Sequence, residues 1–351
     1  MSYSPSDFPE LHSAQDTMFV LVNRTPYAAE RTFVRDKTGA DHWVIAVRAT
    51  FTVTSNGTLK LDDEQKPPLL APEYFGDPGM SSVRYETDLT LMKPGTDVLV
   101  NGAAYAPRGR AVSELPVRLR AHQIEKTLMV YGLRVMYGGP MGLTTTDPRP
   151  FVRSPIRYED AYGGSDITSP NRAKHRADMR NPIGRGFGKW SPELEHAPAP
   201  SVVYLNTPPS KPGPAGLGAL ASYWTPRREL GGTYDERWNK EQKPLLPLDW
   251  SDQSLMCAPA DQQSEYLRGD EPVELVHLTP DTVFRFQVPK VYLAFRTFFG
   301  SKTEEHRSKL VSLIIEPDDR RVIAVWLTNL RISLRMMDYL DKTEIREKRY
   351  I

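Results

Sequence analysis

The chain has little of the chemistry that cross-links and thiolate metal sites require. Its 351 residues include one cysteine, Cys257. A single cysteine excludes an internal disulfide framework and a zinc site built on several thiolates. The histidines are scattered, with no pair at i, i+2 or i, i+4, so we expect no metal site. Cys257 follows Met256, and such a thiol is more typical of a small core residue than of a nucleophile.

Long apolar runs and an excess of one charge are also missing. No segment approaches the roughly 18 apolar residues of a membrane-spanning helix. Residues 1–16 are polar and lack the basic start and apolar core of a signal peptide. Lys plus Arg number 45 and Asp plus Glu number 44, so the net charge of +1 gives no reason to expect nucleic acid or a membrane as partner. These absences favour a soluble, cytoplasmic protein.

Proline is abundant, with 31 residues against an ordinary share of about 5%. Prolines at that density interrupt helices and favour turns and strand edges. Period-2 alternation and β-branched residues predict strands in the first part of the chain. These lie at 43–54, 59–61, 85–91, 98–100, 115–121 and 128–136, with Asn56-Gly57 as a type I′ hairpin turn.

The strand pattern returns near the C-terminus, at 273–278, 283–288, 291–299, 310–315 and 321–330. The fold class that follows is mainly β. We expect a sandwich- or barrel-like body built from N- and C-terminal strand sets, with a long, ordered, loop-rich Gly/Pro/aromatic middle. Residues 333–350 resemble a short charged helix.

The expected domain organisation has three parts. A flexible tail covers residues 1–16, a β-rich domain covers 17–330 and a charged C-terminal segment covers 331–351. The β-rich domain could form two lobes, 17–137 and 223–330, joined by the loop-rich residues 138–222.

The segment from Tyr223 to Glu271 is dense in aromatics, glycines and prolines and has no regular period. Such a segment cannot bury itself as a helix or a strand, so it must lie across other elements. Loops on a rigid scaffold commonly carry binding, and Tyr, Trp and Arg are frequent interface anchors. The predicted partner-binding residues are Tyr204, Tyr223, Trp224, Trp238, Met336, Met337 and Tyr339.

Carboxylates flanked by aromatics offer an alternative, a glycosidase-like site. Glu159 and Asp235, with Glu271, lie near Tyr158, Tyr162, Tyr234, Trp224 and Trp238 in the sequence. Paired carboxylates beside aromatic rings are what glycoside hydrolysis requires. The competing interpretation is structural, because such carboxylates also pair with arginines to hold irregular loops. On that interpretation the motif residues Arg157, Tyr158, Glu159, Tyr162, Arg227, Tyr234 and Asp235 tie the middle loops to the scaffold.

Four motifs together resemble a known family. They are Lys93–Gly102 (KPGTDVLVNG) with Ala104–Pro107 (AYAP), Arg157–Gly164 (RYEDAYGG), Asn181–Phe187 (NPIGRGF), and the spaced set Trp224, Arg227, Gly232–Asp235, Trp238, Pro247 and Asp249. In order and spacing they resemble a bacterial domain-of-unknown-function family encoded in type VI secretion gene clusters, over roughly residues 17–300.

The resemblance implies an effector adaptor or chaperone. Such a protein binds a cargo effector, often one with a PAAR-type domain, and helps to load it on the VgrG spike. It implies no catalysis, no cofactor and no catalytic residues. The alternative remains a carbohydrate-active enzyme or carbohydrate-binding sandwich that uses Glu159 and Asp235.

Overall fold

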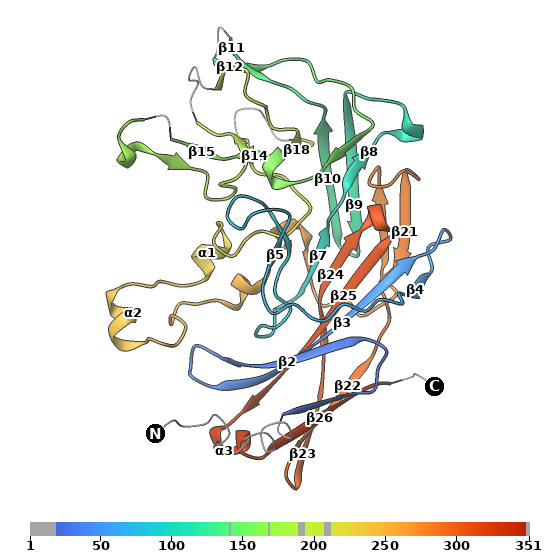
Figure 1. Ribbon diagram of the computed structural model, residues 1–351, viewed down its shortest axis with the longest axis vertical. Coiled ribbons are helices and arrows are strands. Elements are labelled where there is room, and N and C mark those ends of the chain that lie inside the picture. Colours follow the sequence, from blue (N-terminus) through green and yellow to red (C-terminus); the bar gives the residue numbers. More distant parts are fainter. Residues whose placement is uncertain (1–18, 140–141, 168, 189–193, 207–211, 349–351) are drawn as a thin grey trace, which may run out of the picture.

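The computed structural model describes residues 19–139, 142–167, 169–188, 194–206 and 212–348 (Figure 1). The predicted tail at 1–16 lies outside these residues. Strands dominate, and the three α-helices of the described residues are single short turns. They are α1 (Arg227–Leu230), α2 (Glu236–Glu241) and α3 (Leu334–Met337). The prediction of a mainly β protein is confirmed.

A seven-stranded sheet forms the centre of the molecule. Its strands, in spatial order, are β19 (Gln263–Ser264), β7 (Thr96–Val100), β24 (Lys309–Glu316), β25 (Arg321–Ile332), β3 (Asp41–Val53) and β2 (Ala28–Arg35), with β4 (Leu59–Leu61) also on β3. β3 is buried on both faces, with Trp43, Ile45 and Val47 in one core and Val44 and Ala46 in another. Near-continuous burial of this kind is typical of a strand covered on both sides.

Two further sheets pack on one face of the central sheet. The five-stranded sheet consists of β18 (Val202–Tyr204), β10 (Ile124–Tyr131), β9 (Glu114–Ala121), β20 (Pro272–Val276) and β21 (Val283–Gln287). The four-stranded sheet consists of β1 (Val20–Asn23), β26 (Leu340–Glu347), β22 (Leu293–Phe299) and β23 (Lys302–Arg307). Both contribute to the core that contains Trp43, for example through Leu119, Phe284 and Phe295.

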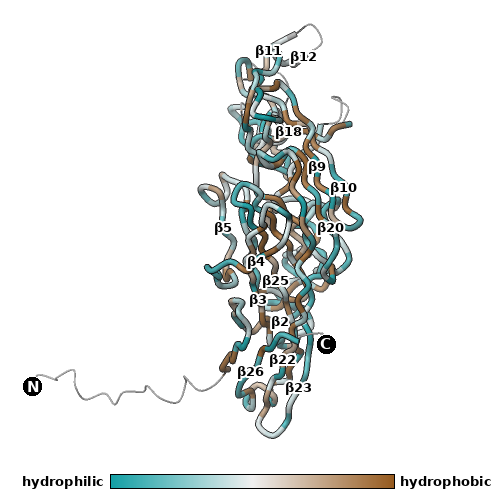
Figure 2. Tube along the Cα trace, turned by 90° about the vertical axis from the view of Figure 1, so that its right-hand side faces the viewer, coloured by the Kyte–Doolittle hydropathy of each residue, from teal (hydrophilic) through white to brown (hydrophobic). Residues whose placement is uncertain are grey.

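Each of these three sheets contains strands from both the N-terminal and the C-terminal strand sets, so the predicted common body is confirmed. The body resembles a sandwich and not a closed barrel, because the central sheet runs open from β19 to β2. Figure 2 shows the layers from the side, with β5 on one side of β25 and β9, β10 and β20 on the other.

A chain of buried polar groups joins the central and four-stranded sheets. The indole of Trp43 donates to Thr343 (2.9 Å), whose hydroxyl lies 2.8 Å from that of Thr297. Thr297 and Thr328 each lie 2.8 Å from one ring nitrogen of His306. The His306 ring also stacks on Phe295. Polar as well as apolar contacts therefore join the central and four-stranded sheets.

The other face of the central sheet is covered by irregular chain, which we call the loop layer (residues 66–95 and the described parts of 154–201 and 205–262). A second core lies beneath it, where Tyr158, Trp224 and Cys257 pack with Leu99 and Val325. The remaining strands pair in twos. They are β5 (Glu73–Tyr74) with β6 (Val83–Tyr85), β8 (Ala103–Tyr105) with β13 (Arg153–Pro155), β11 (Met136–Gly139) with β12 (Gly142–Thr145), β14 (Tyr162–Gly163) with β17 (Arg185–Gly186), and β15 (Ser165–Asp166) with β16 (Arg176–Ala177).

Two predictions of local structure near the N-terminus are wrong. The Asn56-Gly57 hairpin forms, but Gly57 (φ 84°) and not Asn56 has a positive φ, and Gly57 N–H donates to Thr54 (3.0 Å). This is the pattern of a type I turn closed by a left-handed glycine. The strand predicted at 85–91 ends at Tyr85, because Asp88 accepts from Leu69 N–H (2.9 Å) and pairs with buried Arg48 (2.6 Å).

The predicted helix at 333–350 is also wrong. Only α3 is helical, and β26 follows it as a central strand of the four-stranded sheet. Thr343 and Ile345 of β26 are fully buried. The tertiary pairing of alternate residues prevails here over the high charge, which suggested a solvent-exposed helix.

Candidate partner-binding surface

The loop layer is held by buried side chains that reach main-chain groups. Arg227 is the clearest case, because its guanidinium donates to the carbonyls of Leu220 (2.6 Å) and Ser254 (3.0 Å) and to the carboxylate of Glu86 (2.5 Å). One side chain thus joins three loop segments. The carboxylate partner of Arg227 is Glu86 and not Glu159 or Asp235.

Trp224 belongs to the core and not to the surface. It is 0% exposed, and its ring meets that of Tyr158 edge-on at 5.4 Å. Tyr158 in turn donates to the carbonyl of Gly218 (3.3 Å). The prediction of Trp224 as a partner anchor is therefore wrong, since a side chain without exposed area cannot contact a partner of the folded chain.

A buried ion pair that the sequence did not reveal lies under the layer. Lys93 Nζ is 2.8 Å from Asp97 Oδ2 and 3.0 Å from Ser312 Oγ. Asp97 also accepts from the main-chain N–H groups of Cys257 (3.0 Å) and Ala258 (2.9 Å). The two main-chain bonds to Asp97 fasten residues 257–258 to β7.

Burial in this cluster also determines the state of the thiol. The pKa of Cys257 is raised, first by burial and then by the neighbouring Asp97 carboxylate. A raised pKa keeps the thiol protonated and a poor nucleophile. This agrees with the interpretation of Cys257 as a small core residue.

We call residues 231–250 the aromatic knob. This segment contains α2 and projects from the loop layer (Figure 1, lower left). Asp235 caps α2 by accepting from Trp238 N–H (2.8 Å), and the Trp238 indole donates to the carbonyl of Leu245 (2.9 Å). Tyr234 lies edge-on to Trp238 at 4.7 Å and stays 58% exposed. Leu248, 69% exposed, lies in the same segment.

The knob is fastened to the turn between β2 and β3. Gln242 donates to the carbonyl of Lys37 (3.0 Å), and Lys37 Nζ donates to the carbonyl of Trp250 (2.9 Å). A Cβ on Gly39 would lie 3.5 Å from Leu245. The exposed side chains of the knob are therefore presented by an ordered base.

Tyr204 and Tyr223, two other predicted anchors, are less available. Tyr204 is half-buried, donates to Asp261 (3.0 Å) and lies under the ammonium of Lys126, 4.9 Å from the ring centre. Burial lowers the pKa of Lys126 to about 8, against the opposing effect of Asp261. Tyr223 is at the surface, with its ring edge-on to Trp224.

The carboxylates of the glycosidase-like alternative each have their own structural partner. Glu159 accepts from the main-chain N–H of Ser82 (2.8 Å) and from its hydroxyl, and Glu271 accepts from Arg268 N–H (2.7 Å) and Gly269 N–H (2.8 Å). Asp235 is occupied as the helix cap. Arg157 stacks on Phe75 at 3.6 Å from the ring centre, and burial lowers its pKa. The structure thus gives the three carboxylates no shared contact.

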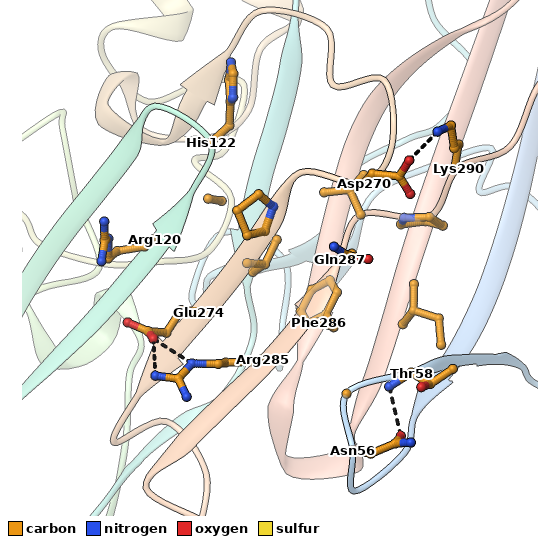
Figure 3. Close-up of a pocket in the computed structure, with 17 residues that line it drawn as sticks. Asn56, Thr58, Arg120, His122, Asp270, Glu274, Arg285, Phe286, Gln287 and Lys290 are labelled. Atoms are coloured by element: carbon orange, nitrogen blue, oxygen red, sulfur yellow. Dashed lines mark hydrogen bonds and ion pairs between the residues drawn. The ribbon is translucent and has the colours of Figure 1, made fainter.

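A cavity of about 690 Å³ opens between the ends of β20 and β21 and the β3–β4 hairpin (Figure 3). Its carboxylates, Glu274 and Asp270, face Arg285 and Lys290. The hydrogen bond from Arg285 is the main cause that lowers the pKa of Glu274. Both acids are therefore paired with cations, and most of the other lining residues are uncharged.

The C-terminal candidates divide into two kinds. Met336 and Met337 pack partly buried against the core that contains Trp43. Tyr339 is 65% exposed. Tyr339 is therefore the more exposed of the C-terminal candidates.

Sequence reasoning gave no metal-ligand set, and within the described residues no group of three His, Cys, Asp or Glu side chains could hold a metal ion. None of the helices in the described part of the chain is long and apolar enough to cross a membrane.

Comparison with protein families identifies the class of protein. Residues 38–327 match the family described as "Uncharacterized protein conserved in bacteria (DUF2169)". The match covers most of the chain, which therefore belongs to this family. Searches of curated proteins and of solved structures found no match.

Proposed function

We propose that this protein is a non-catalytic, cytoplasmic adaptor of type VI secretion. It binds a cargo effector, one with a PAAR-type domain, and aids the loading of that effector on the VgrG spike. The four motifs that resemble the family encoded in type VI secretion clusters support this proposal. The chain contributes no turnover of its own in this role.

The observation that carries the proposal is the aromatic knob. Tyr234 and Leu248 are large, exposed side chains on an ordered base. Rigid aromatic anchors lose little conformational entropy on binding, so they are effective at interfaces. Interfaces also concentrate their binding energy in a few such residues. We therefore assign cargo binding to the knob.

Co-expression with the effector encoded beside the gene, followed by gel filtration, tests the proposal. The wild-type chain should co-elute with the effector in a one-to-one complex. The double variant Tyr234→Ala/Leu248→Ala should weaken binding by about 30-fold or more, because truncation of central anchors costs about 2 kcal/mol or more.

The matched control is Leu334→Ala/Tyr339→Ala, which removes equally exposed side chains from the C-terminal candidate surface. Loss of binding in this variant alone would move the cargo site to the C-terminal segment. A wild-type chain that never co-elutes with an effector or PAAR protein would overturn the adaptor proposal. Glycan hydrolysis that disappears in Glu159→Gln, at unchanged stability, would favour the enzyme alternative.

A further inference from the structure

A second surface of distinct chemistry projects from the loop layer. We call it the basic arm, residues 165–167 and 169–180. β15 and β16 pair antiparallel at its base, with Ser165 opposite Ala177 and Asp166 opposite Arg176. A short 3-10 turn, Arg172–Lys174, lies between these strands. Figure 1 shows the arm at the edge of the molecule, above α1 and α2.

The base of the arm is fixed by a buried asparagine. Asn181 is fully buried, and its amide donates to the carbonyls of Tyr158 (2.8 Å) and Tyr162 (3.0 Å). Its own carbonyl accepts from Gly164 N–H (2.8 Å), where φ is 102°. A Cβ at Gly164 would lie 2.5 Å from the carbonyl oxygen of Gly184, so glycine is required there. The arm is thus an ordered projection of the layer.

The arm carries a local excess of positive charge. Residues 169–177 contain three cationic side chains and no acidic one, whereas the whole chain has a net charge of +1. Arg172, Lys174 and Arg176 are exposed, and none forms an ion pair with another described residue. Asp178, at the base, is buried and already paired with Arg180 (2.6 Å). Over the whole arm, four cationic side chains exceed the two acidic ones, Asp166 and Asp178, so the arm presents a net positive charge to solvent.

Exposed apolar side chains flank these charges. Ile167 is 65% exposed and Met179 is 37% exposed. A methionine adapts to partners of different shape. The arm has no Phe, Tyr or Trp, the residues on which single-stranded nucleic acids stack. This combination fits an acidic polypeptide with apolar residues better than a nucleic acid.

We propose that the basic arm binds an acidic segment of the cargo protein, in which Asp or Glu residues alternate with apolar ones. This inference rests on the proposed function, since it names the chemistry of a cargo segment, and it adds a surface separate from the aromatic knob. Opposite charges across such a surface accelerate encounter and exclude like-charged partners. Binding through the arm is accordingly sensitive to salt.

The test uses the full chain and the triple variant Arg172→Glu/Lys174→Glu/Arg176→Glu. The control variant reverses three other exposed arginines without ion pairs among the described residues, Arg108, Arg110 and Arg331. Two readouts apply, co-elution with the co-expressed neighbouring effector, and fluorescence anisotropy with a labelled 14-residue Glu/Leu peptide. A Lys/Leu peptide and a 14-nucleotide single-stranded DNA serve as comparison probes.

The arm variant should bind the Glu/Leu peptide about tenfold or more weakly than wild type, because three exposed charge contacts become repulsions. The control variant should bind like wild type, and 0.5 M NaCl should remove the difference. Equal binding by both variants, or tighter binding of the DNA than of the Glu/Leu peptide, would overturn the inference.

The two proposals fail in distinguishable ways. If wild type co-elutes with the effector and the arm variant does so equally well, only the inference about the arm is overturned. If wild type binds the Glu/Leu peptide through the arm but retains no effector, the adaptor function is overturned and the arm remains an acidic-peptide site.

Discussion

The two faces of the central sheet are covered in different ways. On one face, the five- and four-stranded sheets satisfy their main-chain groups through strand ladders that extend over many residues. On the other face, the loop layer has main-chain bonds of its own, and four buried side chains in or beneath it each bond two main-chain groups. They are Asp97, Asn181, Arg227 and Gln262. Stability is thus spread out on the first face and concentrated in single residues on the second.

The largest effect should come from the substitution Asp97→Asn. It leaves Lys93 charged and without its carboxylate in a buried site, and it places an amide against the N–H groups of Cys257 and Ala258. Loss of one partner from a buried pair costs about 3–5 kcal/mol. Urea denaturation should show a loss of this size.

The control is Glu305→Gln, which removes the exposed partner of Arg296 on the strand-covered face. Its effect should be small, because both side chains are solvated. If Asp97→Asn and Glu305→Gln lowered the free energy of unfolding equally, the proposed difference between the two faces of the central sheet would be wrong.

The free energy of unfolding should decrease in acid because of His306, a buried residue on the strand-covered face. Burial lowers the pKa of His306 from 6.5 to about 4. As the pH falls from 6.5 to about 4, the unfolded chain gains this proton and the folded chain does not, so stability decreases across that window. The lowered pKa corresponds to about 3 kcal/mol.

Urea unfolding at pH 7 and pH 4.5 measures this loss. His306→Gln keeps a polar group between Thr297 and Thr328 but cannot titrate, so it should reduce the dependence on pH. An unchanged pH dependence in this variant would show that other groups cause the acid sensitivity.

A smaller and local effect is expected for Asn181→Ala. The carbonyls of Tyr158 and Tyr162 would lose their donor, which costs about 1–3 kcal/mol when the groups stay buried. Hydrogen exchange should accelerate at residues 158–164 and 178–187 while β3 and β25 remain protected. The exposed cap Asn171→Ala is the control, and uniform acceleration through the body would contradict a local role.

The same contrast explains what the sequence could predict. Alternation identified β9, β20 and β21, since a strand with one buried face carries its pattern within a few residues, and β-branched content identified β3 and β25. The loop layer has no such pattern, because its order comes from contacts distant in sequence. Gln262, for example, donates to Val98 (2.8 Å) and Leu217 (2.9 Å). Residues 85–91 alternate without forming a strand, since Asp88 is engaged by Leu69 and Arg48.

The candidate site was also only partly predictable, because burial of its aromatic side chains depends on contacts distant in sequence. Aromatic content selected Tyr223–Glu271, the segment that contains the knob. It did not separate Trp224, in the core, from Tyr234 at the surface. Tyr234, which was predicted to be structural, is the exposed one of the two. Burial depends on the packing of Tyr158 and Leu99, which are far from Trp224 in sequence.

The position of β26 constrains the order in which the protein can assemble during synthesis. β1 lies at the edge of the four-stranded sheet and pairs only with β26 among the described residues, in parallel, with Val20 opposite Lys342. β22 also pairs with β26, so this sheet cannot close until residues near 340–347 have left the ribosome. The indole of Trp43 likewise lacks its acceptor, the hydroxyl of Thr343, until Thr343 has been synthesised. β1 therefore remains without its β26 partner until residues 340–347 have been synthesised, a period in which an unpaired strand is open to misassembly.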